Sequence, residues 1–584
     1  MIQHRVELHD LHAHLFRITL TIPEPSPGQT FSMPVWIPGS YLVREFSKQV
    51  QALAATQGGK KIAISQLSKN TWRLANTSTK PITVSYQVYA FDASVRTAYL
   101  DATRGFFNGT SLFMRVAGQE NNPQQVVIEH SAQTKNWRIA TGLPKFKANH
   151  YQADNYDELA DSPFELGDFW EGQFTVRGIK HLFVVSGAAA TFDGKRLLAD
   201  TQKIVETELT FWHGKNGKPP QALLSKGSKG GYIFMLSAVD NGYGGLEHMN
   251  STALIAKRGD LPRIGESTAP EGYTTLLGLI SHEYFHTWNV KRLRPAELVP
   301  YNYDVENHTE LLWFFEGFTS YYDDLLLRRA GLVSDEQYLG LLAKTINQVQ
   351  QTPGRLVHSL ASSSYEAWTK YYRMDENSVN STVSYYTKGS LVALCLDLML
   401  RERGSNLDVV MQTLWQKHCL PRKPNVTGIA EADILQAIPD RVCRKALLQW
   451  VQATIDLPLT QLLATAGVET VAVKAGLAQQ LGLRVGTDGG SIKVKQVLAG
   501  TLAHKAGFAA GDEWLAVEVK NQTWRISSLD DVLLHVPSGK PITAWVARDK
   551  QMLKLTLTLP KNQMLNADVK LKITDAKKLA NWLE

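Results

Sequence analysis

The chain has 584 residues. Single hydrophobic cores stop growing at roughly 250–300 residues, so we expect about three or four domains. The hydrophobic fraction of 44% and charged fraction of 20% are ordinary for globular proteins, which excludes long disordered regions. The net charge of +7 comes from 62 basic and 55 acidic residues spread along the sequence. Nucleic-acid binding needs clustered Lys and Arg, so we expect no nucleic-acid partner.

Three features of the sequence predict a soluble, cytoplasmic protein with no membrane partner. The N-terminal residues lack the charged-then-apolar layout of a secretion signal. No stretch approaches the roughly 18 apolar residues of a membrane span, and the nearest, 391–400, contains Asp397. Cys395, Cys419 and Cys443 are too few for a disulfide framework, and we expect them to be small buried hydrophobes.

Residues 1–168 read as an all-β N-terminal domain, most simply a β-sandwich. The predicted strands are short runs rich in β-branched and aromatic residues, separated by Pro, Gly and Asn, at 17–22, 31–37, 82–89 and 125–128.

The pattern changes after residue 168. Strand-like runs at 181–185 and 232–239 flank a helical stretch at 200–213, and apolar residues then recur at helical spacing from 273 to 465. Mixed strands followed by many helices predict an α+β catalytic domain at 169–466.

Strands return in the last part of the chain. Alternating runs at 491–497, 514–519 and 553–559 predict a small module at 467–562. The Lys-rich segment 563–584 shows little pattern, and we expect a C-terminal tail there.

The candidate chemistry starts from a His-Glu-x-x-His pattern. On a helix, His282 and His286 leave the same face one turn apart, which suits tetrahedral Zn²⁺. Glu283 lies beside them, where it can act as a general base. A histidine on a buried helix is more often a core residue than a ligand, so the pattern needs a third donor.

Glu316 is the expected third donor. It lies within an aromatic-rich predicted helix, 310–320, where a carboxylate is costly unless it is paired or bound to a metal. Glu310 is nearer the expected helix start, where an acid merely complements the helix dipole. We therefore expect one Zn²⁺ per chain, held by His282, His286 and Glu316.

Longer motifs around these residues resemble a known family. His282–Pro295, which reads HEYFHTWNVKRLRP, resembles the M61 metallopeptidases, the glycyl aminopeptidase family related to M1 aminopeptidases in the gluzincin group. Trp313–Thr319 resembles the third-ligand helix of that family, and Pro38–Arg44 and Val95–Asp101 resemble its N-terminal domain. The resemblance covers nearly the whole chain and implies a multidomain α+β protein whose zinc peptidase domain is thermolysin-like.

The resemblance also implies how substrate is held. Gly244-Gly245-Leu246-Glu247-His248 is similar to the Gly-Ala-Met-Glu-Asn exopeptidase motif of the M1 relatives. Glu247 would then bind the α-ammonium group of the peptide, while the backbone of Gly244 and Gly245 pairs with it. An ordinary carboxylate at a strand edge is the alternative. His248 replaces the Asn of that motif, which leaves its role open.

Tyr385–Gly389 resembles the Tyr-x-Lys-Gly pattern at the start of an M1 helix. This alignment assigns to Tyr386 the hydroxyl that stabilises the developing oxyanion. Tyr385 takes that role if the alignment shifts by one residue. A tyrosine pair that only covers a helix start is the third interpretation.

The segments 481–485 and 497–515 resemble a bacterial PDZ domain. Such domains bind a peptide as an added strand and hold its C-terminal carboxylate in a loop, here Leu481-Gly482-Leu483. The module would bind the C-terminus of a peptide or brace the catalytic domain.

Together, the motifs predict a zinc aminopeptidase acting on peptides with a free N-terminus. The resemblance implies a preference for small N-terminal residues, Gly and Ala. The alternatives are a zinc endopeptidase or dipeptidase with substrate presented by the PDZ-like module, or a non-catalytic PDZ scaffold. A scaffold has no need of three metal ligands and a base.

Overall fold

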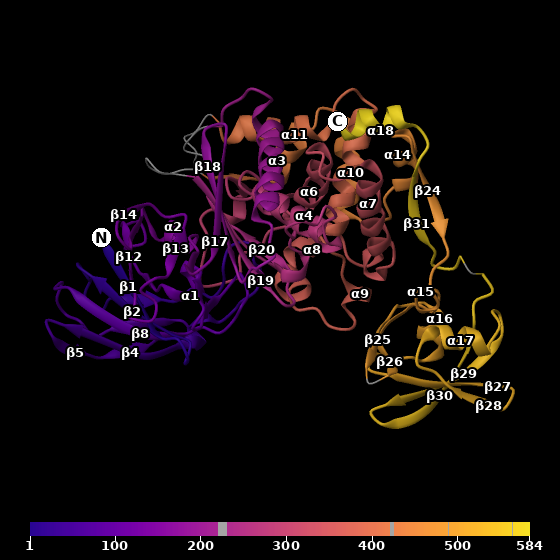
Figure 1. Cartoon of the computed structure of the whole chain (residues 1–584), viewed down its shortest axis with the longest axis horizontal. Helices are drawn as coiled ribbons and strands as arrows, with labels where there is room; N and C mark the ends of the chain where they lie inside the picture. Colours follow the sequence, from indigo (N-terminus) through magenta and orange to yellow (C-terminus); the bar gives the residue numbers. More distant parts are fainter. Residues whose placement is uncertain (220–230, 421–425, 489, 563) are drawn as a thin grey trace. The chain divides into compact units, whose positions relative to one another are not determined.

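The computed structural model of the chain describes residues 1–219, 231–420, 426–488, 490–562 and 564–584 (Figure 1). The chain forms two compact units, each assembled from separate stretches of sequence. The first contains Met1–His308, Tyr322–Val333 and Met411–Ile434. The second contains Thr309–Tyr321, Ser334–Val410 and Leu435–Glu584.

The first unit begins with a β-rich region whose main sheet has the strand order β14-β15-β12-β1-β2-β8-β4-β5. Side chains alternate between the two faces of a strand, and every second residue of β1 from Ile2 to Leu8 is buried. The strands are β1 (Ile2–Asp10), β2 (Leu15–Ile22), β4 (Val50–Gln57), β5 (Lys60–Ile62), β8 (Ile82–Tyr89), β12 (Gln124–Glu129), β14 (Lys145–Lys147) and β15 (His150–Ala153).

Two four-stranded sheets complete this region, with orders β13-β16-β10-β9 and β11-β3-β7-β6. Their elements, with two short helices, are β3 (Thr30–Ser32), β6 (Ile64–Gln66), β7 (Thr71–Leu74), β9 (Ala98–Leu100), β10 (Arg104–Phe107), β11 (Arg115–Val116), β13 (Arg138–Thr141), β16 (Phe164–Gly167), α1 (Gly109–Leu112) and α2 (Tyr156–Ala160). The predicted strand at 31–37 is wrong beyond Ser32, since Pro34 has no N–H to continue a ladder.

A five-stranded sheet of the first unit, ordered β17-β18-β19-β21-β20, carries two helices. Its elements are β17 (Trp170–Val176), β18 (Ile179–Ser186), α3 (Gly194–His213), β19 (Gly231–Val239), β20 (Gly244–Glu247), β21 (Ser251–Lys257) and α4 (Glu271–Phe285). These bounds contain the strands predicted at 181–185 and 232–239 and the helix predicted at 200–213. Strand β20 is the edge of this sheet and pairs antiparallel with β21.

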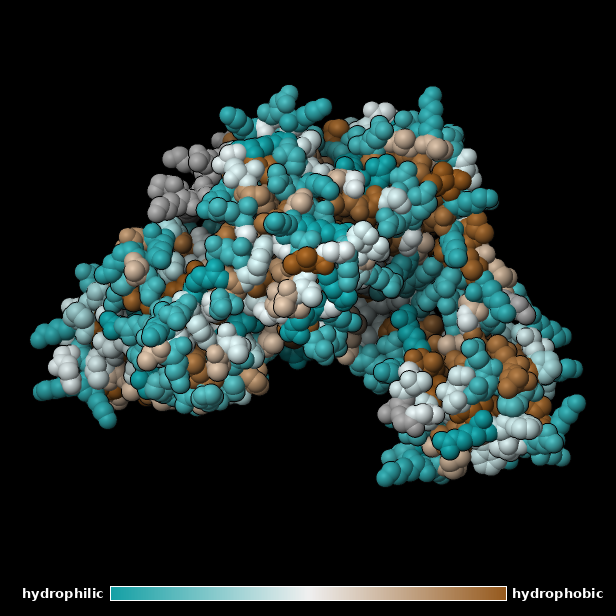
Figure 2. Space-filling view, in the orientation of Figure 1, coloured by the Kyte–Doolittle hydropathy of each residue, from teal (hydrophilic) through white to brown (hydrophobic). Residues whose placement is uncertain are grey.

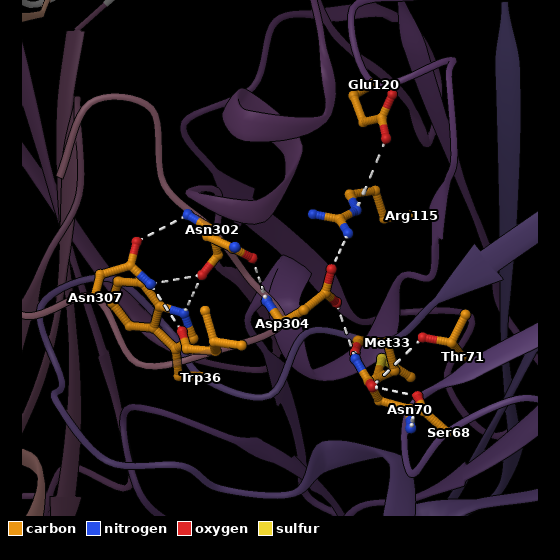
Figure 3. Close-up of polar contacts among 11 residues, drawn as sticks. Met33, Trp36, Ser68, Asn70, Thr71, Arg115, Glu120, Asn302, Asp304 and Asn307 are labelled. Carbon is orange, nitrogen blue, oxygen red and sulfur yellow. Dashed lines mark hydrogen bonds and ion pairs between the residues drawn. The ribbon is translucent and has the colours of Figure 1, made fainter. Parts of the chain in front are cut away.

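A polar network joins the loop around Asp304 to the N-terminal strands (Figure 3). Asp304 accepts hydrogen bonds from Asn70 Nδ2, at 2.9 Å, and from Arg115. Trp36 Nε1 donates to the carbonyl of Asn302 at 2.7 Å, and Asn307 closes the loop on the same carbonyl. The network holds the segment after Trp36, which reaches the candidate site.

The middle of the chain is helical, as predicted. Its elements are α5 (Leu312–Phe315), α6 (Gly317–Arg329), α7 (Asp335–Gln350), α8 (Leu360–Tyr365), a π-helix η6 (Ala367–Tyr371), α9 (Ser378–Ser381), α10 (Thr387–Arg401), α11 (Leu407–His418), α12 (Glu431–Ala437), α13 (Arg441–Gln452) and α14 (Leu459–Thr465), with the parallel pair β22 (Leu293–Pro295) and β23 (Thr427–Ile429). The apolar run at 391–400 lies in α10, and none of the described helices is long and apolar enough to cross a membrane. The face seen in Figure 2 is largely hydrophilic, with apolar residues scattered over it.

The C-terminal β region has its own hydrophobic core and a sheet ordered β25-β26-β27-β29-β30, with β28 paired to β27. Its elements are α15 (Leu477–Leu481), β25 (Leu483–Asp488), β26 (Ser491–Val497), α16 (Leu502–Ala506), β27 (Glu513–Val519), β28 (Gln522–Arg525), α17 (Leu529–His535), β29 (Pro541–Arg548) and β30 (Gln551–Thr558). The chain is therefore a multidomain α+β protein with a β-rich start, a helical middle and a C-terminal β region.

The expected C-terminal tail is mostly ordered structure in its described part, 564–584. Strand β31 (Asp568–Ile573) pairs with β24 (Val468–Val473), and helix α18 (Ala576–Leu583) buries one face. Trp582 is 1% exposed, and its Nε1 donates to Tyr321 Oη at 3.1 Å. Tyr321 donates in turn to the buried Asp397 at 2.8 Å. This packing could not be predicted from the sequence alone, because β24 and Tyr321 lie far upstream in the chain.

We predict that Trp582→Ala lowers the thermal unfolding midpoint. Removing a buried indole leaves a cavity that costs about 3–5 kcal/mol, and Tyr321 loses its donor. Calorimetry measures the change. The matched control is Lys577→Ala on the exposed face of α18, which should leave the midpoint within about 1 °C because exposed substitutions rarely matter. Equal midpoints for the two variants would contradict the docking of α18.

Candidate active site

Helix α4 positions two histidines at its C-terminal end. The apolar residues before them, including Leu276, Leu277 and Ile280, are buried and fasten the helix to the sheet. The backbone N–H of His286 donates to the carbonyl of His282 at 3.2 Å, so the helical turn continues through both residues. Their ring centroids are 4.6 Å apart. The two imidazoles therefore share one face, as their spacing predicts.

Hydrogen bonds orient both rings. His286 Nδ1 is 2.7 Å from the carbonyl of Asn289, and a carbonyl only accepts, so His286 carries its proton on Nδ1. His282 Nδ1 is 2.9 Å from Asp323 Oδ2 on α6. Partners of this kind set the tautomer of a metal-binding histidine and direct its Nε2 to the ion.

Two groups of potential metal ligands occur among the described residues. One ligand atom from each of His282, His286 and Glu316 lies within 4.8 Å of the others, and the same holds for Glu247, Glu283 and His286. Two imidazoles and one carboxylate are a donor set of catalytic zinc sites. The residues present therefore fit a zinc ion.

Glu316 lies between two helices rather than within one, which corrects the expected continuous helix at 310–320. Helix α5 ends at Phe315 and α6 begins at Gly317. Gly317 packs against Gly389 of α10 so closely that a Cβ would lie 2.6 Å from the Cα of Gly389. Glu316 is 2% exposed. The glycine contact thus sets the position of a buried carboxylate.

The edge strand β20 passes very close to Glu283. A Cβ on Gly245 would lie 2.0 Å from Glu283 Oε1, so only glycine fits there. Glu283 itself is 5% exposed. Its carboxylate therefore lies against the strand that the resemblance assigns to substrate.

Glu247, at the end of β20, is held by a loop of the N-terminal region. It is 4% exposed, and a Cβ on Gly39 would lie 2.5 Å from its Oε1. Gly39 has a φ of +91°, a conformation that favours glycine. The predictions did not assign Gly39 to the site, although it lies in the Pro38–Arg44 motif.

A charged network lies beside Glu247 and gives His248 a partner. Asp161 accepts hydrogen bonds from Lys291 Nζ at 2.7 Å and from the backbone N–H of Met249 at 2.7 Å. His248 Nδ1 is 3.3 Å from the same carboxylate. Burial would raise the pKa of Asp161, but the charge of Lys291 and the His248 contact outweigh it and hold the pKa below its ordinary value. Asp161 is therefore ionised at neutral pH and balances a buried cation.

Three tyrosines gather near Glu316. Burial, followed by the charge of Glu316, raises the pKa of Tyr386 well above its ordinary value. Burial and a smaller effect of Glu316 raise the pKa of Tyr371 to about 12. The Tyr371 ring centroid lies 4.8 Å from that of Tyr385 and 5.5 Å from that of Tyr386. The sequence analysis did not assign Tyr371 to the site. In the sequence it is marked only by its neighbour Tyr372, with which it forms a second tyrosine pair. In the structure it ends a π-helix, a feature frequent at functional sites.

We predict that Asp161→Asn lowers the thermal unfolding midpoint, because it leaves the buried Lys291 cation without its counter-charge. Breaking such a pair costs about 3–5 kcal/mol. The lowered pKa means that the stabilisation by ionised Asp161 is present above its unfolded pKa and is lost as pH falls through the folded value. The difference in unfolding midpoint from wild type should hold between about pH 5 and pH 8 and shrink in stronger acid. The lower limit of this range is about one unit above the ordinary pKa of Asp.

The control is Asp168→Asn, whose side chain is 97% exposed. It should match wild type at every pH in calorimetry. A neutral-pH midpoint for Asp161→Asn equal to that of the control would rule out the buried pair as a stabilising element.

Two family models and several solved structures resemble parts or all of this chain. Family models described as Peptidase M61 N-terminal domain and M61 glycyl aminopeptidase match residues 3–168 and 275–392. A search of curated proteins gives no match. An M1 zinc metallopeptidase from Deinococcus radiodurans aligns over 78% of this chain and 94% of its own, with 12% identity and a TM-score of 0.46. A mutant of a Deinococcus radiodurans M1 zinc metallopeptidase bound to the substrate Tyr-Ser-Ala aligns over the same shares, with 11% identity and a TM-score of 0.45.

One solved structure matches along its whole length. It is the crystal structure of an aminopeptidase N family protein from Idiomarina loihiensis, with 36% identity, a TM-score of 0.92 and 100% coverage of both chains. The M61 glycyl aminopeptidase model covers the motifs at 282–295 and 313–319, and the N-terminal model covers those at 38–44 and 95–101. The chain therefore belongs to the M61 peptidase family, the family of glycyl aminopeptidases.

Proposed function

We propose that this protein is a zinc aminopeptidase that removes small residues, Gly and Ala first, from peptides with a free N-terminus. The observation that carries the proposal is the convergence of Glu247, Glu283 and His286, whose ligand atoms lie within 4.8 Å of one another. This convergence places Glu247, which can bind an ammonium group, next to Glu283, which can transfer a proton. Membership of a glycyl aminopeptidase family supports the preference for small residues.

One Zn²⁺ would be held by His282, His286 and Glu316. The hydrogen bonds of the two Nδ1 atoms support ligation through Nε2. When bound, zinc supplies Lewis-acid chemistry that polarises a carbonyl and acidifies water. Two histidines from one helix and a glutamate between α5 and α6 support a thermolysin-like domain at 169–466.

Glu283 is the proposed general base. It takes a proton from the attacking water and passes it to the leaving amine. Its contact with Gly245 supports this role, because β20 is the sheet edge to which an extended peptide adds as a further strand. The scissile bond would then lie beside Gly245.

Glu247 is the proposed anchor for the substrate ammonium group. A carboxylate that is 4% exposed gains most from a positively charged ligand, and a free N-terminus brings that charge. The backbone of Gly244 and Gly245 would pair with the peptide. An acylated N-terminus carries no charge and leaves Glu247 uncompensated, which favours exopeptidase over endopeptidase action.

Tyr386 is the proposed donor to the oxyanion. Its raised pKa keeps the hydroxyl protonated at neutral pH, as a donor requires, and the effect of Glu316 on that pKa supports a position near the ligands. Tyr385 and Tyr371 share the cluster and are the alternatives.

The C-terminal β region at 467–562 is proposed to be a PDZ-like module. Its strand β25 is a sheet edge, and Gly482 before it has a φ of +79°, which suits a carboxylate-binding loop at 481–483. Asn380 also binds the backbone of Val497 and Ala499, which supports bracing of the helical region. Peptide binding and bracing are compatible.

The test is hydrolysis of aminoacyl p-nitroanilides with and without a chelator. Gly and Ala substrates should react fastest, and zinc should restore activity after chelation. Glu283→Gln should keep one zinc per chain by elemental analysis yet lose at least about 10²-fold in kcat, the scale of general-base catalysis. Glu310→Gln, an exposed acid six residues before Glu316 in the sequence, is the control that keeps activity. Cleavage of N-acetylated peptides as fast as free ones would overturn the aminopeptidase assignment.

We predict that Tyr386→Phe lowers kcat by about 10²–10³-fold with little change in KM, because an oxyanion donor acts only in the transition state. Steady-state kinetics on an alanyl substrate measures this. Tyr385→Phe and Tyr371→Phe are the matched controls and should keep kcat within about threefold, because they belong to the same cluster but are not the proposed donor. A large loss confined to one of these controls would move the donor role to that residue.

A further inference from the structure

Arg96, from the loop before β9, reaches the edge strand β20. Its Nη2 donates to the carbonyl of Gly245 at 3.0 Å, and its Nη1 lies 3.5 Å from the place of a Cβ on Gly244. Among the described residues Arg96 forms no ion pair, and its buried Nε has no hydrogen-bond partner. The half-buried guanidinium therefore has donors left for a ligand, and a carboxylate would match its charge.

The position of Arg96 along β20 indicates which ligand group it meets. Glu247 ends the strand, Glu283 touches Gly245, and Arg96 reaches Gly244 and Gly245. A peptide with its N-terminus at Glu247 and its scissile bond near Glu283 runs antiparallel to β20. Two extended residues span about 7 Å. The second residue of the substrate therefore ends where Arg96 lies.

We propose that Arg96 binds the C-terminal carboxylate of dipeptides and makes them the preferred substrates of this enzyme. The inference rests on the proposed aminopeptidase function. The planar guanidinium suits a carboxylate, which it can bind through two hydrogen bonds. A longer peptide carries no carboxylate at its second residue, so it does not gain this interaction.

The competing role for Arg96 is structural, since its bond to Gly245 also steadies the strand. A purely structural role affects all substrates alike. Binding of a carboxylate affects only substrates that carry one at the second residue. The ratio of kcat/KM for glycyl-phenylalanine to that for glycyl-phenylalanine amide separates the two roles.

The experiment compares these two substrates in the zinc-loaded enzyme. Wild type should favour the free acid by about tenfold or more, the effect of one charge-assisted hydrogen bond at 1.4 kcal/mol per factor of ten. Arg96→Met should bring the ratio to about one, and Arg96→Lys should retain part of it because a point charge remains. Arg17→Met, on the exposed Arg17–Glu7 pair, is the control with the wild-type ratio.

Binding gives a second readout. In the Glu283→Gln background, calorimetry should show tighter binding of glycyl-phenylalanine than of its amide, and adding Arg96→Met should remove the difference. A ratio of one in wild type, or an unchanged ratio in Arg96→Met, overturns the inference while aminopeptidase action stands. Equal losses on both substrates assign Arg96 to the structural role. No cleavage of either substrate by wild type overturns the proposed function itself.

Discussion

The close approach of strand β20 to helix α4 is the constraint on which the candidate site depends. Only a glycine at 245 lets the strand lie against Glu283, and only a glycine at 39 lets the N-terminal loop lie against Glu247. Both carboxylates are almost fully buried. The two glycines therefore bring backbone close to acidic groups at the edge of a sheet, where we propose that the peptide is held and cleaved.

Burying so many acids requires compensating charge, and the same unit supplies it. Lys291 pairs with Asp161 beside Glu247, while Arg292 donates to the carbonyls of Met249 and Thr287. Burial lowers the pKa of Arg292 to about 10, so it still carries its charge at neutral pH. These cations follow α4 directly, where they also complement its C-terminal dipole. The site is thus supported by hydrogen-bonded charges.

In the second unit, glycines again decide how close two elements come. Gly317 and Gly389 pack against each other at the boundary between α5 and α6, and Glu316 is the residue between these two helices. The C-terminal helix α18 fastens the same region through Trp582, Tyr321 and Asp397. A segment without a clear sequence pattern therefore stabilises the helix that follows a proposed metal ligand.

The sequence by itself determined the local parts of this protein. The spacing of His282 and His286 sets their shared helix face, the strand runs at 82–89 and 232–239 lie in β8 and β19, and the M61 motifs identified the family. Local periodicity carries this information because neighbours along a helix or strand are neighbours in space. Two predictions were wrong. The strand predicted at 31–37 ends at Ser32, because Pro34 has no N–H to continue the ladder. The segment predicted as a tail is ordered, because β31 and α18 pack against residues far upstream.

Only the tertiary structure decided the long-range contacts. Gly39 against Glu247, Arg96 on Gly245, Asp161 with Lys291 and Trp582 with Tyr321 join residues far apart in the chain. No periodicity encodes such pairs, because each forms only when separate elements have packed. The proposed metal ligands, base and ammonium anchor could thus be predicted from the sequence, while the contacts that position them, and Arg96 on β20, became visible only in the fold.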